Sequence, residues 1–335
     1  MRAVVADRYG PPQVLVVRDL PVPQPGPGQI QVRVRAAALN PADLRTLSGV
    51  MRDFAPLTFP HVPGSDFAGT VTEIGPGVTR FAPGDEVFGV GLPRATVAMA
   101  AMLSAPPSLT TGAMAEYAVF EADTPAITHR PVGLAADHAA TLPIPGLTAL
   151  AVLREGGFEA GERILVTGAA GGVGGAVVPL LAAAGAHVIA TALPEDDDYV
   201  RGLGATDTVD YRSFDTSVET LLRYPGGVDA IVNLALPGPA LVELSHAITM
   251  GGRGRLLNVA FPSPDPAAFD RTDLTVRTVY GAARAGDLDQ LAALAVGETL
   301  PATISRTYPL DQAAQAYIDL ADTHVRGKLL VAVAE

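Results

Sequence analysis

The stretch ERILVTGAAGGVGG, residues 162–175, joins an apolar, strand-like run to a glycine-rich turn and the start of a helix. Small residues let the backbone turn sharply and bring the free N–H groups of a helix N-terminus against an anionic pyrophosphate. The G-x-G-x-x-G pattern is incomplete, because Ala169 replaces its first glycine. A second strand, Val188–Thr191, begins roughly 20 residues further on, which is typical of a dinucleotide site. The alternative is a tight βα turn that binds nothing.

Strand and helix patterns alternate around this stretch from about residue 145, at the spacing of βαβ units. The predicted strands are Arg163–Thr167, Ala186–Thr191, Thr206–Asp210, Val228–Leu234, Arg255–Ala260 and Thr275–Tyr280. The predicted helices between them are Gly172–Ala184, Asp197–Gly202, Thr216–Tyr224 and Pro239–Met250. This order predicts an α/β fold with a doubly wound, mostly parallel sheet of the Rossmann type.

The N-terminal part of the chain has a different sequence pattern, in which short runs of β-branched residues are separated by clusters of Pro and Gly. The runs are Gln29–Ala36, Ala68–Ile74, Glu86–Val90 and Ala115–Phe120. They predict a partly open β-barrel over residues 1–125. The C-terminal tail adds predicted helices at Gly286–Val296 and Leu310–Ala321 and a strand at Lys328–Val333. We expect the tail to fold back onto the barrel, so that residues 1–125 and 281–335 form one domain and residues 126–280 the other.

Composition excludes several functional classes. The chain of 335 residues has a net charge of −12 and a single lysine, which disfavours binding to nucleic acid or to an anionic membrane surface. Without cysteine there is no disulfide, no thiolate nucleophile and no cysteine-ligated zinc. The uncharged stretches 95–115 and 164–194 contain Pro or many Gly residues, so neither is expected to span a membrane. The N-terminus lacks the apolar run of a signal peptide, which predicts a cytoplasmic protein.

Eight segments, in order along nearly the whole chain, resemble the medium-chain dehydrogenase/reductase superfamily in its zinc-independent, quinone-oxidoreductase-like branch. They are Leu39–Asp43, Phe59–Gly69, Gly75–Gly89, Gly112–Tyr117, Leu142–Ala149, Ala169–Gly174, Gly204–Ala205 and Arg326–Val331. The resemblance implies a GroES-like barrel beside the Rossmann domain and a homodimer. It also implies hydride transfer from a nicotinamide cofactor to a quinone or an activated C=C bond.

The resemblance also bears on metal and catalytic residues. Zinc-dependent relatives have a cysteine where this chain has Asn40 and a histidine where it has Ser65, and an amide and a hydroxyl are poor zinc ligands. We therefore expect no metal, and interpret His61 as a pocket-lining or surface residue. Asn40, Asp43 and Arg45 are the candidate catalytic residues beside the cleft expected between the domains. Asn40 would bind the nicotinamide or a substrate carbonyl, and Arg45 would stabilise enolate charge.

Two questions about these catalytic candidates stay open. Asp43 and Arg45 could instead form a local ion pair on a solvated helix turn. The proton donor is unassigned, because Arg45 stands near the position where some relatives carry a tyrosine.

The cofactor-binding candidates follow from the turn, from the predicted strand ends and from the resemblance. They are Thr148, Ala170, Gly171, Gly172, Val173, Gly174, Thr191, Arg201, Tyr211, Asn233, Ala235, Leu236, Ala260, Phe261, Arg326 and Lys328. NADPH is favoured over NADH, because Ala192 supplies no carboxylate for a ribose 2′-hydroxyl and Tyr211 matches a tyrosine of NADPH-binding relatives. Arg201 or Arg326 would pair with the 2′-phosphate. The acids Glu195–Asp198 would repel that phosphate or, alternatively, complement a helix dipole.

The apolar segment between residues 91 and 112 is predicted either as a lid over an apolar or aromatic small-molecule substrate or as a subunit contact. Two other functions stay open on the same fold. One is a non-redox cyclase or isomerase, and the other is a nucleotide-binding protein without turnover.

Overall fold

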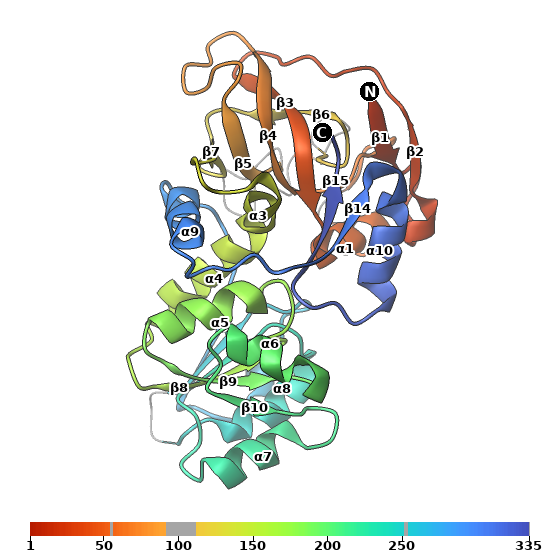
Figure 1. Cartoon of the computed structure of the whole chain (residues 1–335). Helices are drawn as coiled ribbons and strands as arrows, with labels where there is room; N and C mark the ends of the chain where they lie inside the picture. The colour runs from red at the N-terminus through yellow and green to blue at the C-terminus, as the bar shows by residue number, and fades with distance from the viewer. Residues whose placement is uncertain (54–55, 92–111, 251–253, 335) are drawn as a thin grey trace. The chain divides into compact units, whose positions relative to one another are not determined.

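The computed structural model describes residues 1–53, 56–91, 112–250 and 254–334 (Figure 1). The chain divides into two compact units. Unit 1 comprises Met1–Leu147, Ala282–Gly297 and Ala302–Glu335, and unit 2 comprises Thr148–Gly281 and Glu298–Pro301. None of the described helices is long and apolar enough to cross a bilayer.

Unit 2 is built on a six-stranded sheet in the order β10-β9-β8-β11-β12-β13, and every pairing is parallel. The strands are β8 (Arg163–Thr167), β9 (His187–Thr191), β10 (Asp207–Val209), β11 (Ala230–Asn233), β12 (Gly254–Asn258) and β13 (Leu274–Thr278). The order reverses between β8 and β11, which is where doubly wound sheets bind their ligands. The predicted Rossmann sheet and all six of its strands are confirmed.

Four helices connect these strands, namely α5 (Gly174–Ala183), α6 (Asp197–Gly202), α7 (Thr216–Arg223) and α8 (Gly238–Leu244). The helix predicted at Pro239–Met250 is too long. After α8 the chain makes a 3-10 turn, Ser245–Ala247, and Ile248 then pairs with Val228 in a parallel bridge. The extended backbone that this bridge requires ends the helix.

Unit 1 contains a two-stranded sheet, β1-β2, and a seven-stranded sheet in the order β14-β15-β3-β4-β5-β7, in which β6 also pairs with β3. The strands are β1 (Arg2–Val5), β2 (Val16–Asp19), β3 (Gln29–Ala38), β4 (Asp66–Ile74), β5 (Glu86–Val90), β6 (Tyr117–Glu121), β7 (Ile127–His129), β14 (Ile304–Pro309) and β15 (Lys328–Ala332). The helices are α1 (Pro41–Ser48), α3 (Ala136–Thr141), α9 (Asp287–Val296) and α10 (Ala313–Asp322), together with the start of α4 (Pro143–Gly156). β15 pairs antiparallel with β3, so the C-terminal tail adds a strand to the sheet of unit 1.

The boundary predicted after residue 125 lies inside unit 1. β7 continues the sheet beyond it by pairing with β5. Further along, the Ile144 amide donates to the buried carboxylate of Asp66 over 3.0 Å. Because sheet pairing and this hydrogen bond hold residues 126–147 to the barrel, the division falls after Leu147.

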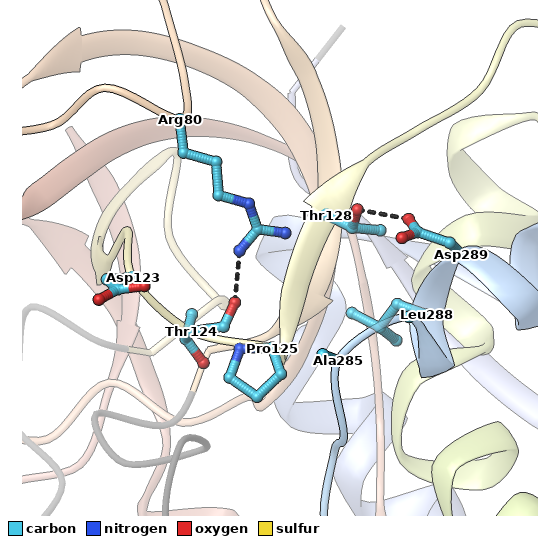
Figure 2. A pocket seen from close by; sticks show the side chains of 9 residues that line it. Arg80, Asp123, Thr124, Pro125, Thr128, Ala285, Leu288 and Asp289 are labelled. Atoms are coloured by element: carbon cyan, nitrogen blue, oxygen red, sulfur yellow. Dashed lines mark hydrogen bonds between the residues drawn. The ribbon is translucent and has the colours of Figure 1, made fainter.

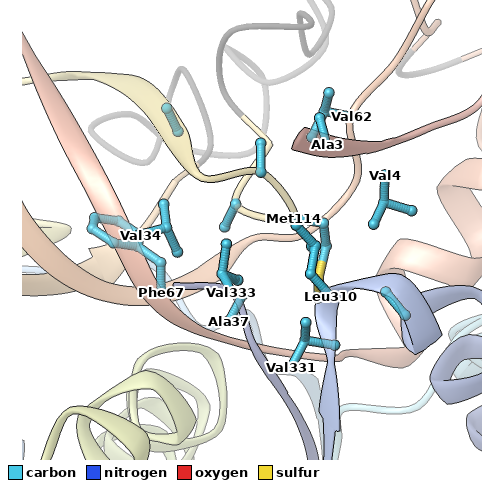
Figure 3. Close-up of a cluster of buried hydrophobic side chains, with 14 of the residues drawn as sticks. Ala3, Val4, Val34, Ala37, Val62, Phe67, Met114, Leu310, Val331 and Val333 are labelled. Atoms are coloured by element: carbon cyan, nitrogen blue, oxygen red, sulfur yellow. The ribbon is translucent and has the colours of Figure 1, made fainter. Parts of the chain in front are cut away.

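The core of unit 1 gathers side chains from both ends of the chain (Figure 3). Val34, Phe67 and Val331 are fully buried, and the Phe67 ring stacks on that of Phe120 with centroids 4.2 Å apart. Burial of this apolar surface is the main driving force that brings residues 1–147 and the tail together.

We predict that Gly69→Ala destabilises unit 1. A Cβ at this position of β4 would lie 2.3 Å from the carbonyl oxygen of Arg33, a backbone atom that cannot easily move. We expect the free energy of unfolding to fall by about 2 kcal/mol, as measured by urea unfolding followed by circular dichroism. Gly202→Ala is the control, since no heavy atom lies within 4 Å of its Cβ position. Equal urea midpoints for Gly69→Ala and the wild type would contradict the prediction.

Candidate functional site

The turn between β8 and α5 has the geometry of an anion site. Gly168 has φ of +67°, and a Cβ on Gly174 would lie 2.2 Å from the carbonyl oxygen of Ala169, so both positions require glycine. The Gly171 amide donates to the Gly168 carbonyl over 3.1 Å, which tightens the turn. The first amides of a helix lack intrahelical acceptors and attract negative charge. The backbone at residues 170–174 therefore fits the pyrophosphate of a dinucleotide.

A buried polar chain links the carboxyl ends of β8, β11 and β12. Thr167 Oγ1 donates to Asn233 Oδ1 over 2.7 Å, and Asn233 Nδ2 donates to Asn258 Oδ1 over 2.7 Å. Asn233 Oδ1 also accepts from the amide of Leu236, and Asn258 Nδ2 donates to the carbonyl of Ala260. Thr167 and Asn258 were missed in the sequence, although polar residues that end buried strands are a visible signal.

This chain of hydrogen bonds changes the role predicted for Asn233. The residue is fully buried and its amide is occupied by protein groups, so it does not extend toward a ligand. Instead it fixes the backbone of Ala235 and Leu236, just as Asn258 fixes Ala260. Phe261, the next residue, is 44% exposed. Ala235, Leu236, Ala260 and Phe261 lie where the fold places ligands, and their cofactor contacts stay a prediction.

Arg201, predicted to pair with the 2′-phosphate, already has partners on its own helix and the following strand. Its guanidinium donates to Asp197 over 2.7 Å, to the carbonyl of Thr206 and to Thr208. The hydrogen bond that it donates to Asp197 is the main cause that raises the pKa of Arg201. Asp197 in turn accepts from the Thr208 hydroxyl. Because the cation is neutralised locally, Arg201 is poorly suited to pair with a phosphate.

Tyr211 and Arg212 follow β10 and are both exposed, with 46% of Tyr211 and 67% of the Arg212 side chain accessible. Arg212 Nη1 lies 4.0 Å from Glu195 Oε1. Partial burial is the main cause that raises the pKa of Tyr211, with further contributions from Asp196 and Glu195. Arg212 was not among the candidates from the sequence, although it directly follows the candidate Tyr211. Thr191, at the end of β9, is buried.

The remaining unit 2 candidate is Thr148, which is buried. The backbone of Gly281 packs against it so closely that a Cβ there would lie 2.6 Å from Thr148 Oγ1. Its contact with the nicotinamide stays a prediction.

In unit 1 the structure brings together a buried polar cluster from segments far apart in the sequence. Asn40 Nδ2 donates to Asp66 Oδ2 over 3.0 Å, and Lys328 Nζ donates to Asn40 Oδ1 over 2.6 Å. Lys328 also donates to the Leu39 carbonyl over 2.7 Å and lies 3.5 Å from Asp66. Burial raises the pKa of Asp66 and lowers that of Lys328, and their mutual attraction opposes both shifts.

Asp43 joins this cluster from the first turn of α1. Its carboxylate accepts from the Asn40 amide and the Ser65 hydroxyl, each over 3.0 Å, and from the Tyr317 hydroxyl over 3.4 Å. Burial is the largest cause that raises the pKa of Asp43 to about 6, and Asp66 adds to it. Because Asp43 is only 8% exposed, the alternative of an ion pair on a solvated helix turn is wrong for this residue. Tyr317, from α10, could not be found from sequence spacing.

The three basic candidates of unit 1 differ in their surroundings. Lys328 is 4% exposed, and its ammonium donates to the Leu39 carbonyl and to Asn40, so its predicted contact with the cofactor stays a prediction. Arg45, on α1, is half-buried, which lowers its pKa. Arg326 lines a cavity of about 300 Å³ with Arg306, Asp319 and His324. Its pairing with a phosphate stays a prediction.

His61 is buried, as a pocket-lining residue would be. Only 7% of it is exposed, and burial lowers its pKa to about 4. Its Nδ1 has no hydrogen-bond partner among the residues that the structure describes. Within those residues no group of three or more His, Asp or Glu side chains is arranged to hold a metal ion. Residues 92–111, predicted as a lid or a subunit contact, lie outside the described part of the chain.

A second cavity of unit 1, of about 320 Å³, lies beside β7 and α9 (Figure 2). Arg80 donates to the Thr124 carbonyl over 2.6 Å, and Thr128 donates to Asp289 over 2.6 Å. None of the predicted site residues lines this cavity. Its polar groups hold the loop before β7 and the start of α9 in place.

The sheet order and the glycine turn of unit 2 define a dinucleotide-binding protein of the Rossmann class. The family model for the alcohol dehydrogenase GroES-like domain matches residues 26–130, and that for the zinc-binding dehydrogenase matches residues 203–331. Quinone-oxidoreductase QR1 of Triphysaria versicolor, a chloroplastic protein, is 31% identical over 348 residues, covering 99% of this chain and 98% of that protein.

Two further relatives agree. The mitochondrial NAD(P)H oxidoreductase RTN4IP1 of Bos taurus is 28% identical over 340 residues, covering 89% of this chain and 80% of that protein. The structure of the quinone oxidoreductase from Coxiella burnetii matches with a TM-score of 0.85 at 28% identity, covering 100% of this chain and 99% of that one. The chain belongs to the medium-chain dehydrogenase/reductase superfamily, in its quinone-oxidoreductase-like branch, and is an NAD(P)H-dependent reductase.

We predict that Asp43 makes stability depend on pH. The folded protein keeps the Asp43 proton up to a pKa of about 6, whereas the ordinary pKa of an aspartate is 3.8. The stability that this residue contributes is therefore present below about pH 4 and is lost as the pH rises through 6. Asp43→Asn has no such loss, so the variant should gain stability relative to the wild type as the pH rises from about 4 to about 6, with no further gain above that range. Urea midpoints of both proteins at several pH values measure this difference, and a difference that does not vary with pH would contradict it.

Proposed function

We propose that this protein transfers a hydride from NADPH to a quinone or to the activated C=C bond of an enone or enoyl compound, without zinc. The observation that carries the proposal is the turn from Gly168 to Gly174, where two positions admit only glycine and the backbone leads directly into α5 at the point where the strand order reverses. The relatives named as quinone oxidoreductases support the acceptor class.

The proposal excludes zinc because of the donor atoms that the chain offers. The sequence contains no cysteine. The Asn40 amide is bonded to Asp66 and Lys328, and the Ser65 hydroxyl is bonded to Asp43. Neutral oxygen and nitrogen atoms that already bind protein partners are poor ligands for zinc.

The bound nicotinamide would supply the hydride, and the protein would bind and orient the reactants. The backbone amides of residues 172–174, in the turn that leads into α5, would hold the pyrophosphate. Asn40 has one N–H left after its bond to Asp66, and this donor would bind the carbonyl of the nicotinamide or of the substrate. Arg45 would stabilise negative charge that develops on the acceptor.

The preference for NADPH rests on the residues around the end of β9. Ala192 follows that strand and offers no carboxylate to a ribose 2′-hydroxyl. Arg212 and Tyr211 are exposed after β10, and a guanidinium is a strong phosphate partner. We infer that Arg212, and not Arg201, pairs with the 2′-phosphate. An apolar or aromatic substrate, a homodimer and a cytoplasmic location stay predictions.

A nucleotide titration tests the cofactor site. Gly174→Ala places a Cβ against the Ala169 carbonyl and should widen the turn. We expect NADPH binding, followed by cofactor fluorescence, to weaken by about tenfold or more, which corresponds to 1.4 kcal/mol. Gly202→Ala, whose Cβ would meet nothing within 4 Å, should bind as the wild type does. Unchanged affinity in Gly174→Ala, or no binding by the wild type, would refute the assignment of this site.

The inferred role of Arg212 has its own test. Arg212→Ala should weaken NADPH binding by about tenfold and leave NADH binding unchanged, because only NADPH carries the 2′-phosphate. Arg223→Ala is the control, since Arg223 pairs with Glu219 on α7. Equal losses of affinity for NADPH and NADH would show that Arg212 does not bind the 2′-phosphate.

A further inference from the structure

Every polar atom of Asn40 has a partner inside unit 1. The backbone amide donates to Asp43 Oδ2, and the backbone carbonyl accepts from the Asp43 amide, each over 3.0 Å. In the side chain, Nδ2 donates to Asp66 Oδ2 over 3.0 Å and Oδ1 accepts from Lys328 Nζ over 2.6 Å. Asn40 itself is 3% exposed.

The two side-chain partners determine which way the amide faces. Lys328 can only donate and an ionised Asp66 can only accept. Turning the amide over would place its N–H groups against the ammonium and its oxygen against the carboxylate. Both contacts would be repulsive in a site that excludes water, where charges interact strongly. The ion pair therefore holds the Asn40 amide in one orientation.

Stability alone does not account for this arrangement. A buried ion pair gives little net stability compared with apolar side chains of similar size, because both charges lose their hydration. Lys328, the single lysine of the sequence, is 4% exposed, and Asp66 is fully buried. What the ion pair does supply is a fixed orientation of the Asn40 amide. The Lys328 ammonium also bonds the Leu39 carbonyl, so the backbone just before Asn40 is fixed as well.

We propose that Asp66 and Lys328 are positioning residues of the reduction. They orient the Asn40 amide so that its remaining N–H is presented in a fixed direction to the carbonyl that it binds. A donor fixed before the reaction needs no reorganisation as charge develops, which is the basis of electrostatic catalysis. The inference rests on the role of Asn40 proposed above.

A cycle of variants of the full chain tests the inference. The variants are Asn40→Ala, the double variant Asp66→Asn with Lys328→Met, and the triple variant that combines them. The double variant removes both charges, so neither is left buried alone. Val331→Ala is the control, because it truncates a buried side chain of the same strand, β15, and its side chain belongs to the hydrophobic core. The readout is kcat/KM for NADPH oxidation by 1,4-benzoquinone, corrected for the uncatalysed reaction.

We expect Asn40→Ala to lower kcat/KM by about 100-fold and the double variant by about tenfold. The triple variant should match Asn40→Ala, because orientation has no effect once the amide is gone. The kcat/KM of folded Val331→Ala should stay within about twofold of the wild-type value. The positioning role would be overturned if the loss of kcat/KM in the triple variant equalled the product of the two separate losses. A double variant as active as Val331→Ala would overturn it too.

Two further results separate this inference from the proposed function. If Asn40→Ala is as active as the wild type, the role of Asn40 fails and the positioning role fails with it, while the NADPH titration still tests the cofactor site. If the double variant does not fold, Asp66→Asn with Lys328→Leu replaces it, since this pair also leaves neither charge buried alone. Its loss of several-fold should likewise disappear in the Asn40→Ala background.

Discussion

An ammonium and two carboxylates lie in the interior of unit 1, and charges removed from water must be met by close partners. Lys328, Asp66 and Asp43 meet this requirement with groups from the link between β3 and α1, from Ser65 just before β4, and from α4 and α10. The cluster therefore ties the C-terminal tail to the start of the chain through polar contacts, in addition to the apolar core. Asn40 forms hydrogen bonds with all three charged residues, so its position depends on how completely their hydrogen bonds are formed.

Unit 2 meets a related constraint without charges. Its parallel strands are buried, and the polar ends of β8, β11 and β12 satisfy one another through Thr167, Asn233 and Asn258. These hydrogen bonds fix the loops that leave the carboxyl edge of the sheet, where the strand order reverses.

Family membership and site geometry answer different questions. The relatives establish a reductase that uses a nicotinamide cofactor, and a fold of this kind can serve many substrates. Because the sequence contains no cysteine, the polar groups of its sites are amide, hydroxyl, carboxylate and basic side chains. Around Asn40, burial raises the pKa of both carboxyls and lowers that of the lysine, and the attraction between Lys328 and the carboxyls opposes these shifts.

The sequence by itself determined the strands and helices of the Rossmann sheet and the glycine turn, because hydrophobic periodicity and glycine are local signals. It also contains the ion pair of Arg201, since Asp197 lies four residues earlier on one helix face. Only the tertiary structure decided the role of Lys328, whose partner Asn40 is 288 residues away, and the burial of Asp43 beside Tyr317. Contacts between distant segments leave no periodic trace in a single sequence, because packing alone brings them together.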